Sequence, residues 1–162
     1  MKPRIGISAC LLGQPVRYDG RDKLDPLLAA ELAKRVEWVP VCPETEFGLP
    51  VPREPIQLEG DPARPELRGV RSGCELTCGM RAFCRRRAEG LRGLAGFVFK
   101  ANSPSCGMCV AVRRGGEIAG HAPGFFAAAW LELHPELPAA EAETLHDPET
   151  LRKFLSRLQL KQ

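Results

Sequence analysis

The order of apolar and polar segments in the first 42 residues constrains the fold most strongly. A short apolar run, RIGISA, leads through a turn-rich stretch to DPLLAAELAKR, where Asp25 can cap a helix and Pro26 can occupy its first turn. A second apolar run, VEWVPVC, ends at Cys42. This strand–helix–strand order favours two parallel strands joined by a right-handed crossover. We therefore expect an α/β protein built on a parallel sheet.

The rest of the chain continues this alternation. Helices are predicted over residues 75–91, 124–133 and 147–160, a buried strand over 95–101 and a hairpin over 110–120. The proline-rich residues 43–65 are predicted to form one long loop without regular structure. The 162 residues suit one domain. We expect a single-domain α/β sandwich over residues 1–162, with a short, mostly parallel, Rossmann-like sheet and helices on both faces.

Composition and charge exclude several functional classes. The chain is 44% hydrophobic and 27% charged, and no apolar run approaches the roughly 20 residues that cross a bilayer. The apolar start is broken by Gly6, Ser8 and Cys10, which does not suit a signal peptide, so we expect a cytoplasmic protein. The net charge is only +3, and Glu89 interrupts the basic residues of 81–92. We expect neither a membrane nor nucleic acid as partner.

Three of the seven cysteines share one local setting. Cys10, Cys42 and Cys106 each lie just beyond a predicted strand, at the start of a loop rich in Gly, Pro or Ser. The carboxyl ends of parallel strands meet at one edge of a sheet, where ligands bind. The three thiols are either small buried side chains or ligands of one metal centre. Three thiolates suit a [4Fe-4S] cluster with one open iron better than a structural zinc ion, which takes four ligands.

The remaining cysteines leave other interpretations open. They are Cys74, Cys78, Cys84 and Cys109. Inert thiols are the simplest interpretation of all four. A zinc-stabilised nucleic-acid-binding module built on them is one alternative, because Cys74 and Cys78 lie one helical turn apart. A thiol–disulfide oxidoreductase is another, because Cys106 and Cys109 have the spacing of a redox pair.

Three blocks of the sequence carry a family resemblance. ISACLLGQPVRYDG, VPVCPETEFGLPVPREP and KANSPSCG resemble, in order and spacing, the DUF523 family, whose characterised members are thiouracil desulfidases. The resemblance implies a [4Fe-4S] cluster on Cys10, Cys42 and Cys106, whose open iron binds the sulfur of a thiocarbonyl. The implied partner is a small thiolated uracil-type base or nucleotide. The implied reaction releases hydrogen sulfide and the oxo base without net redox change.

The same resemblance implies residues that act beside the cluster. It gives Glu44, with Glu46 as the competing candidate, as the carboxylate that activates water, and Ser103 as a hydroxyl that stabilises the intermediate and donates a proton. Further candidates for holding the substrate, with structural pairing as the alternative, are Arg17, Tyr18, Asp19, Glu46, Arg53, Asn102 and Ser105. Phe47 takes a position that is commonly glycine in the family, where its ring would narrow or restack the pocket.

Overall fold

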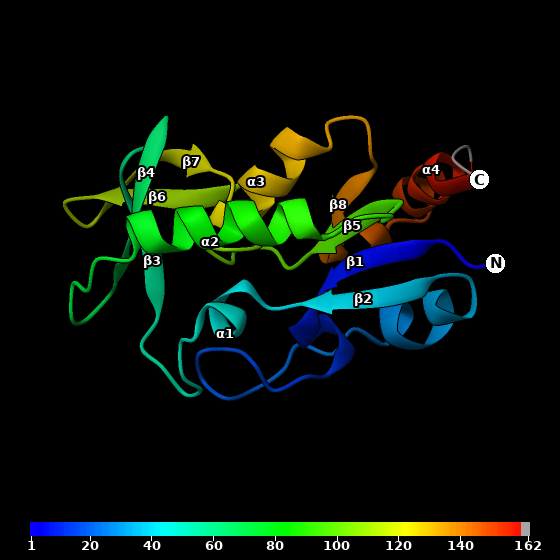
Figure 1. Ribbon diagram of the computed structural model, residues 1–162, viewed down its shortest axis with the longest axis horizontal. Helices are drawn as coiled ribbons and strands as arrows, with labels where there is room; N and C mark the ends of the chain where they lie inside the picture. Colours follow the sequence, from blue (N-terminus) through cyan, green and yellow to red (C-terminus); the bar gives the residue numbers. More distant parts are fainter. Residues whose placement is uncertain (160–162) are drawn as a thin grey trace.

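Two four-stranded sheets organise the computed structural model, which describes residues 1–159 (Figure 1). Sheet A has the order β2–β1–β5–β8 and is parallel throughout; its strands are β1 (Arg4–Ser8), β2 (Glu37–Val41), β5 (Gly96–Phe99) and β8 (Ala139–Glu141). Sheet B has the order β4–β3–β6–β7; its strands are β3 (Ile56–Asp61), β4 (Arg64–Gly69), β6 (Val110–Arg114) and β7 (Glu117–Ala122). Only the β3–β6 pair of sheet B is parallel. The predicted α/β fold with a parallel sheet is confirmed.

Helices cover sheet A on both faces, as predicted. The α-helices are α1 (Pro43–Phe47), α2 (Thr77–Gly90), α3 (Phe125–Leu133) and α4 (Pro148–Gln159). Shorter 3-10 or π turns span Ala9–Leu12, Leu27–Glu31, Leu32–Lys34 and Ala142–His146. One hydrophobic cluster joins Phe97 and Phe99 of β5 to α2 and α3, while Val98 faces a second cluster with α4. Successive β5 side chains therefore bury opposite faces of the sheet, as expected for a central parallel strand.

The segment 43–65 is where the loop prediction is wrong. Its first five residues form α1, because Pro43 suits a first helical turn and the Glu46 carboxylate accepts the Cys42 amide at 2.9 Å. Gly48, with φ 113°, then ends the helix in a left-handed conformation. Further on, Leu58 of β3 is fully buried against sheet B, and β3 pairs along its whole length with β4. The high proline content of this segment led to the prediction of a loop where a helix and a hairpin form.

Two other predictions need smaller corrections. Residues 27–34 coil as a π turn followed by a 3-10 turn and not as an α-helix, although Asp25 accepts the Leu28 amide at 3.3 Å as a cap would. β8 was not predicted, since three residues give no periodic signal. The last helix does begin at Pro148, with the Thr150 amide bonded to the Asp147 carboxylate at 3.0 Å, and residue 160 of that prediction lies outside the described residues.

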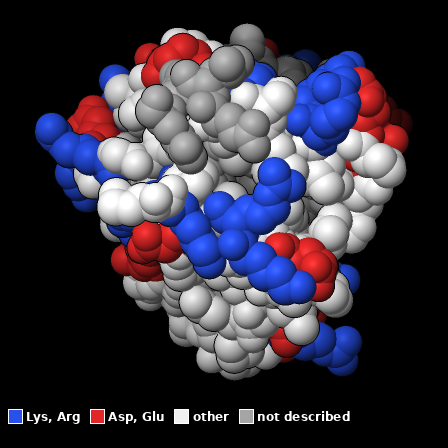
Figure 2. Space-filling model, turned by 90° about the vertical axis from the view of Figure 1, so that its right-hand side faces the viewer, with Lys and Arg blue, Asp and Glu red and all other residues white. Residues whose placement is uncertain are grey.

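The ends of sheet A differ in character. The strands of sheet A start at the end of the molecule that carries the N-terminus and α4 (Figure 1). On this end basic and acidic side chains lie beside one another, with basic ones grouped near the middle of the view (Figure 2). No helix within residues 1–159 is long and apolar enough to cross a membrane. The carboxyl ends of the strands point the other way, toward α1.

Candidate active site

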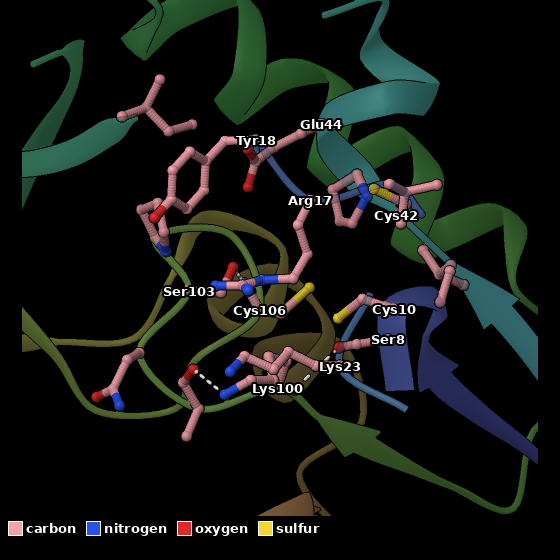
Figure 3. Close-up of a pocket in the computed structure, with 18 of the residues that line it drawn as sticks. Ser8, Cys10, Arg17, Tyr18, Lys23, Cys42, Glu44, Lys100, Ser103 and Cys106 are labelled. Carbon is pink, nitrogen blue, oxygen red and sulfur yellow. Dashed lines mark hydrogen bonds between the residues drawn. The ribbon is translucent and has the colours of Figure 1, made fainter. Parts of the chain in front are cut away.

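The parallel order of sheet A brings three cysteines to one place. β2, β1 and β5 are adjacent, so their carboxyl ends share an edge. Cys42 directly follows β2, Cys10 lies two residues beyond β1, and Cys106 lies in the loop after β5. All three line one pocket of about 410 Å³ (Figure 3). The predicted convergence of these side chains is therefore present in the structure.

Burial and nearby charge define the state of these thiols. Cys10 and Cys106 are buried and Cys42 is half-buried. Burial raises the pKa of Cys10 to about 11, against the opposing charges of Lys100 and Arg17. Burial likewise raises the pKa of Cys106, and Cys42 and Cys10 are close enough to add to that rise. Binding a metal centre would deprotonate the thiols, as thiolate ligands require.

This donor set fits a cluster better than a single ion. Three thiols from separate loops line one pocket. They lie close enough together that charge on Cys10 and Cys42 raises the pKa of Cys106. No group of three or more His, Cys, Asp or Glu side chains among residues 1–159 is arranged to hold one metal ion. A [4Fe-4S] cluster takes its thiolates on separate irons, so its ligands stand farther apart than those of one ion.

The Glu44 carboxylate is fixed on the pocket wall by two partners. Oε1 accepts a hydrogen bond from Arg53 Nε at 3.1 Å and forms an ion pair with Arg53 Nη2 at 3.0 Å, and Oε2 accepts a hydrogen bond from the Ser105 hydroxyl at 3.0 Å. Arg53 also donates to the carbonyls of Val16 at 3.0 Å and Pro50 at 3.2 Å. Its side chain is only 6% exposed, so the guanidinium is enclosed by these contacts. Arg53 thus joins α1 to both neighbouring loops.

The loop that carries Cys106 is held around the Ser103 side chain. The Ser103 hydroxyl oxygen accepts the amides of Ser105 at 3.2 Å and Cys106 at 3.0 Å. The first amides of α3 bond back to the same loop, from Phe125 to Pro104 O at 3.0 Å and from Phe126 to Ser105 O at 2.9 Å. Because backbone amides occupy the Ser103 oxygen, its hydroxyl proton is the part available to a ligand.

The other predicted site residues fall into two groups. Arg17, Tyr18 and Asn102 line the pocket together with Glu44, Arg53 and Ser103, and the Arg17 guanidinium carbon lies 5.5 Å from the centre of the Tyr18 ring. Asp19, Glu46 and Ser105 do not line it. Asp19 lies 3.7 Å from Arg17, Glu46 bonds to the Cys42 amide and, at 2.8 Å, to Arg87, and Ser105 stands behind Glu44.

Phe47 does not narrow the pocket, so that prediction is wrong. Its ring lies 5.7 Å from the Phe83 ring, edge to face. It also packs so closely on α2 that a Cβ added at Gly79 would lie 3.1 Å from it. The side chain follows the inward face of α1 and fastens this short helix to α2. Phe47 therefore supports the helix α1 that carries Glu44 and follows Cys42.

Three polar residues of the pocket lining were missed by the sequence analysis. They are Ser8, Lys23 and Lys100. The buried Ser8 hydroxyl accepts the Lys100 amide at 3.0 Å, which ties the ends of β1 and β5 together. Lys100 Nζ bonds to Ala101 O at 2.9 Å and to Glu143 at 2.8 Å. Ser8 and Lys100 stand within or at the start of the family blocks, which was an available signal, whereas Lys23 lies in a polar stretch that gives none.

The four remaining cysteines are not gathered into a site. Cys74, Cys78 and Cys109 are exposed, whereas Cys84 is buried. Burial raises the pKa of Cys84 to about 12, with the charges of Glu44 and Glu46 adding to the effect. All seven cysteines are free thiols in the structure.

Comparison with known proteins agrees with this geometry. The model of a family described as 2-thiouracil desulfurase matches residues 5–142. A solved structure, the [4Fe-4S]-dependent thiouracil desulfidase TudS, is 30% identical to this chain, with a TM-score of 0.74 over 94% of this chain and 97% of TudS. No curated protein matches the chain.

Proposed function

The chain belongs to the 2-thiouracil desulfurase family, and on that premise we propose that it hydrolyses the C–S bond of a thiolated uracil-type base or nucleotide. The products are hydrogen sulfide and the oxo base. One observation carries the proposal: three cysteines from adjacent parallel strands line the same pocket as the fixed carboxylate of Glu44. A reducing compartment such as the cytoplasm suits the seven free thiols.

Cys10, Cys42 and Cys106 are the residues that would hold a [4Fe-4S] cluster. When bound, the cluster supplies an iron without a protein ligand, a Lewis acid that polarises a thiocarbonyl. The positive charges of Lys100 and Arg17 lie close enough to Cys10 to favour its thiolate. Bonds to other segments support a fixed ligand set: Glu46 accepts from Arg87 of α2, the Lys23 amide donates to Cys10 O, and the Phe125 amide of α3 donates to Pro104 O.

Glu44 is the residue that orients and deprotonates the attacking water. Its Oε2 accepts a single hydrogen bond, from Ser105, and keeps a lone pair for the water, while Arg53 fixes the other oxygen. The water oxygen forms a bond to the thiocarbonyl carbon as the C–S bond breaks. The two hydrogens of the water leave with the sulfur, so atoms balance and no electrons are gained or lost.

Ser103 and the pocket mouth act on the base. The Ser103 hydroxyl, whose oxygen is already bonded to two amides, donates its proton toward the ring as charge develops there. Tyr18 offers an aromatic face for stacking, and Arg17 and Asn102 offer donors to the ring edge. Asp19, Glu46, Arg53 and Ser105 act behind these groups as positioning residues.

The test is sulfide and uracil release from 2-thiouracil and 4-thiouracil by cluster-loaded protein. Glu44→Gln keeps the side-chain shape but removes the base, and we expect kcat to fall about 10²- to 10⁴-fold with unchanged iron content. Glu132→Gln is the matched control, since that glutamate pairs with Arg85 at 3.3 Å on the helices and not in the pocket. Full activity of Glu44→Gln would remove Glu44 from the chemistry, and absence of sulfide from the wild type would refute the function.

A further inference from the structure

We propose that the pocket selects its substrate as an anion: the thiolated pyrimidine binds with one ring nitrogen deprotonated, and Arg17, Lys23 and Lys100 hold the negative charge. This inference rests on the proposed function and deepens it by naming the ionisation state of the substrate. It is carried by the balance of charges and of hydrogen-bond donors on the pocket walls.

Positive charge exceeds negative charge among the side chains that line the pocket. Among the described residues that line it, the cations are Arg17, Lys23, Arg53 and Lys100, and Glu44 is the one carboxylate. Arg53 is committed to Glu44 through one hydrogen bond and an ion pair, and both side chains are largely enclosed. Three cations are left for a ligand. In Figure 3 the Arg17 side chain extends toward Ser103 and Cys106, and the side chains of Lys23 and Lys100 extend below Ser103 in the view.

The carboxylates behind these cations offset their charge only in part. Asp19 stands 3.7 Å from Arg17, and Glu143, which is half exposed, pairs with Lys100 at 2.8 Å. Lys23 has no carboxylate within 4.0 Å among residues 1–159. A [4Fe-4S] cluster would bring three thiolates whose negative charge its iron core offsets only in part, and Arg17 and Lys100, whose charges act on Cys10, balance the remainder. Lys23 is then the cation that remains for an anionic ligand.

The balance of hydrogen-bond donors and acceptors in the pocket also favours an anionic substrate. Arg17 and Lys23 can only donate, and the Ser103 oxygen already accepts two amides. Each oxygen of Glu44 already accepts one hydrogen bond from within the protein, and Oε1 also forms an ion pair with Arg53 Nη2. A neutral thiouracil brings two ring N–H donors into these donor-rich walls. Its monoanion brings one donor fewer and one acceptor more, so fewer groups are left without partners.

Lys23 distinguishes a role of the pocket cations in binding the substrate from a role in stabilising the cysteines. Arg17 and Lys100 lie where their charges act on Cys10, so both also serve the cysteines. Lys23 is not among the groups that shift either buried thiol of the site. Its backbone amide holds the loop by bonding to Cys10 O at 2.9 Å, which leaves the side chain without a structural task. Its ammonium is therefore the cation best assigned to the ligand.

The experiment uses two sulfur-free probes of the same shape, uracil and 6-azauracil, of which the second has the more acidic ring N–H. Their affinities for the cluster-loaded protein are measured anaerobically by titration calorimetry, below and above the pH at which 6-azauracil ionises. We expect 6-azauracil to gain about tenfold over uracil across this interval, as a charged hydrogen bond would give. Lys23→Met should lose most of the gain, whereas Lys34→Met, an exposed lysine outside the pocket, should keep it.

The ratio of the two affinities at each pH removes the contribution of the protein's own titratable groups, because both probes bind the same pocket. Both probes meet the same titratable and charged groups, namely Cys10, Arg17, Tyr18, Lys23, Cys42, Glu44, Arg53, Lys100 and Cys106, with Asp19 and Glu143 behind them. An affinity ratio that stays constant with pH, or a gain that survives in Lys23→Met, would overturn the inference. Failure of the wild type to release sulfide would instead refute the proposed function, whatever the binding ratio.

Discussion

The pocket at the edge of sheet A and a second groove in the molecule contain similar residues but differ in how these are used. The groove, of about 690 Å³, is bordered by α2, α3 and the β3–β4 turn, and it holds Cys78, Arg64, Arg81 and Arg85. Arg85 pairs with Glu89 at 2.9 Å and with Glu132 at 3.3 Å. Arg81 donates to Pro65 O at 2.8 Å and lies 4.8 Å from the Phe125 ring centre.

Topology explains the difference. Cys78, Arg81 and Arg85 come from one face of a single helix, and their contacts pair Arg85 with glutamates and hold Arg81 against Pro65 and Phe125. The pocket instead receives one cysteine from each of three adjacent parallel strands, together with Glu44 and a set of cations. A cysteine beside arginines is thus part of the fold in the groove, whereas convergent strand ends make a site in the pocket.

Among tests that compare the two regions directly, the largest effect is expected from exchanging an arginine for lysine in each. Arg53→Lys should lower kcat at least tenfold, because an ammonium cannot reproduce the planar fork that binds Glu44 and two carbonyls at once. KM and iron content should change little, since Arg53 acts through Glu44. Arg85→Lys in the groove, which swaps a half-exposed ion pair, should leave kcat unchanged.

Chemical rescue then distinguishes positioning from simple destabilisation. Guanidinium ion added to Arg53→Ala should restore part of kcat, and the same addition should not affect Arg85→Ala. Equal kcat in wild type and Arg53→Lys would contradict the role assigned to Arg53.

Much of the fold could be predicted from the sequence, because short apolar runs mark three of the strands of sheet A. β1, β2 and β5 are visible in this way, and with their parallel order the meeting of Cys10, Cys42 and Cys106 follows. Short or proline-rich elements could not be predicted so easily. α1 depends on the bond from the Cys42 amide to Glu46, and β8 on pairing with β5.

The positions of the pocket cations could not be predicted from the sequence. Lys23 reaches the pocket because its amide bonds to Cys10 O, thirteen residues earlier, which closes the loop back on β1. The fixed place of Arg53 likewise depends on its contact with the Val16 carbonyl. Such loop closures depend on tertiary contacts and leave no periodic pattern in the sequence.

A smaller effect is expected from adding a methyl group next to the Cys106 loop. A Cβ at Gly124 would lie 2.6 Å from Ser105 C and 2.8 Å from Pro104 O, so Gly124→Ala must move the loop or α3. We expect the free energy of unfolding to fall by about 1–3 kcal/mol in urea denaturation. Gly90→Ala at the end of α2, where a Cβ meets nothing within 4 Å, is the control and should lose no stability. Equal stability of the two variants would contradict the tight packing of α3 on this loop.

The smallest effect concerns the pH dependence of stability and compares buried Cys84 with exposed Cys78. Burial raises the pKa of Cys84 from 9.0 to about 12 in the folded state. The folded protein thus favours the protonated thiol, so this contribution to stability is complete below pH 9 and is lost as the pH rises toward 12. Tm should therefore fall less steeply above pH 9 in Cys84→Ala than in wild type, measured by scanning calorimetry. Cys78→Ala should follow the wild type, and identical slopes in all three proteins would contradict the burial effect.

The most direct test of the cluster site is anaerobic reconstitution with iron and sulfide, followed by iron analysis and absorption spectroscopy. The wild type is compared with a Cys10→Ala/Cys42→Ala/Cys106→Ala variant and with a Cys74→Ala/Cys78→Ala/Cys109→Ala variant of the three exposed cysteines. We predict about four irons per chain and a broad band near roughly 400 nm in the wild type and in the second variant, and neither in the first. Iron retained by the first variant, or lost from the second, would contradict the assignment of the cluster to the strand ends of sheet A.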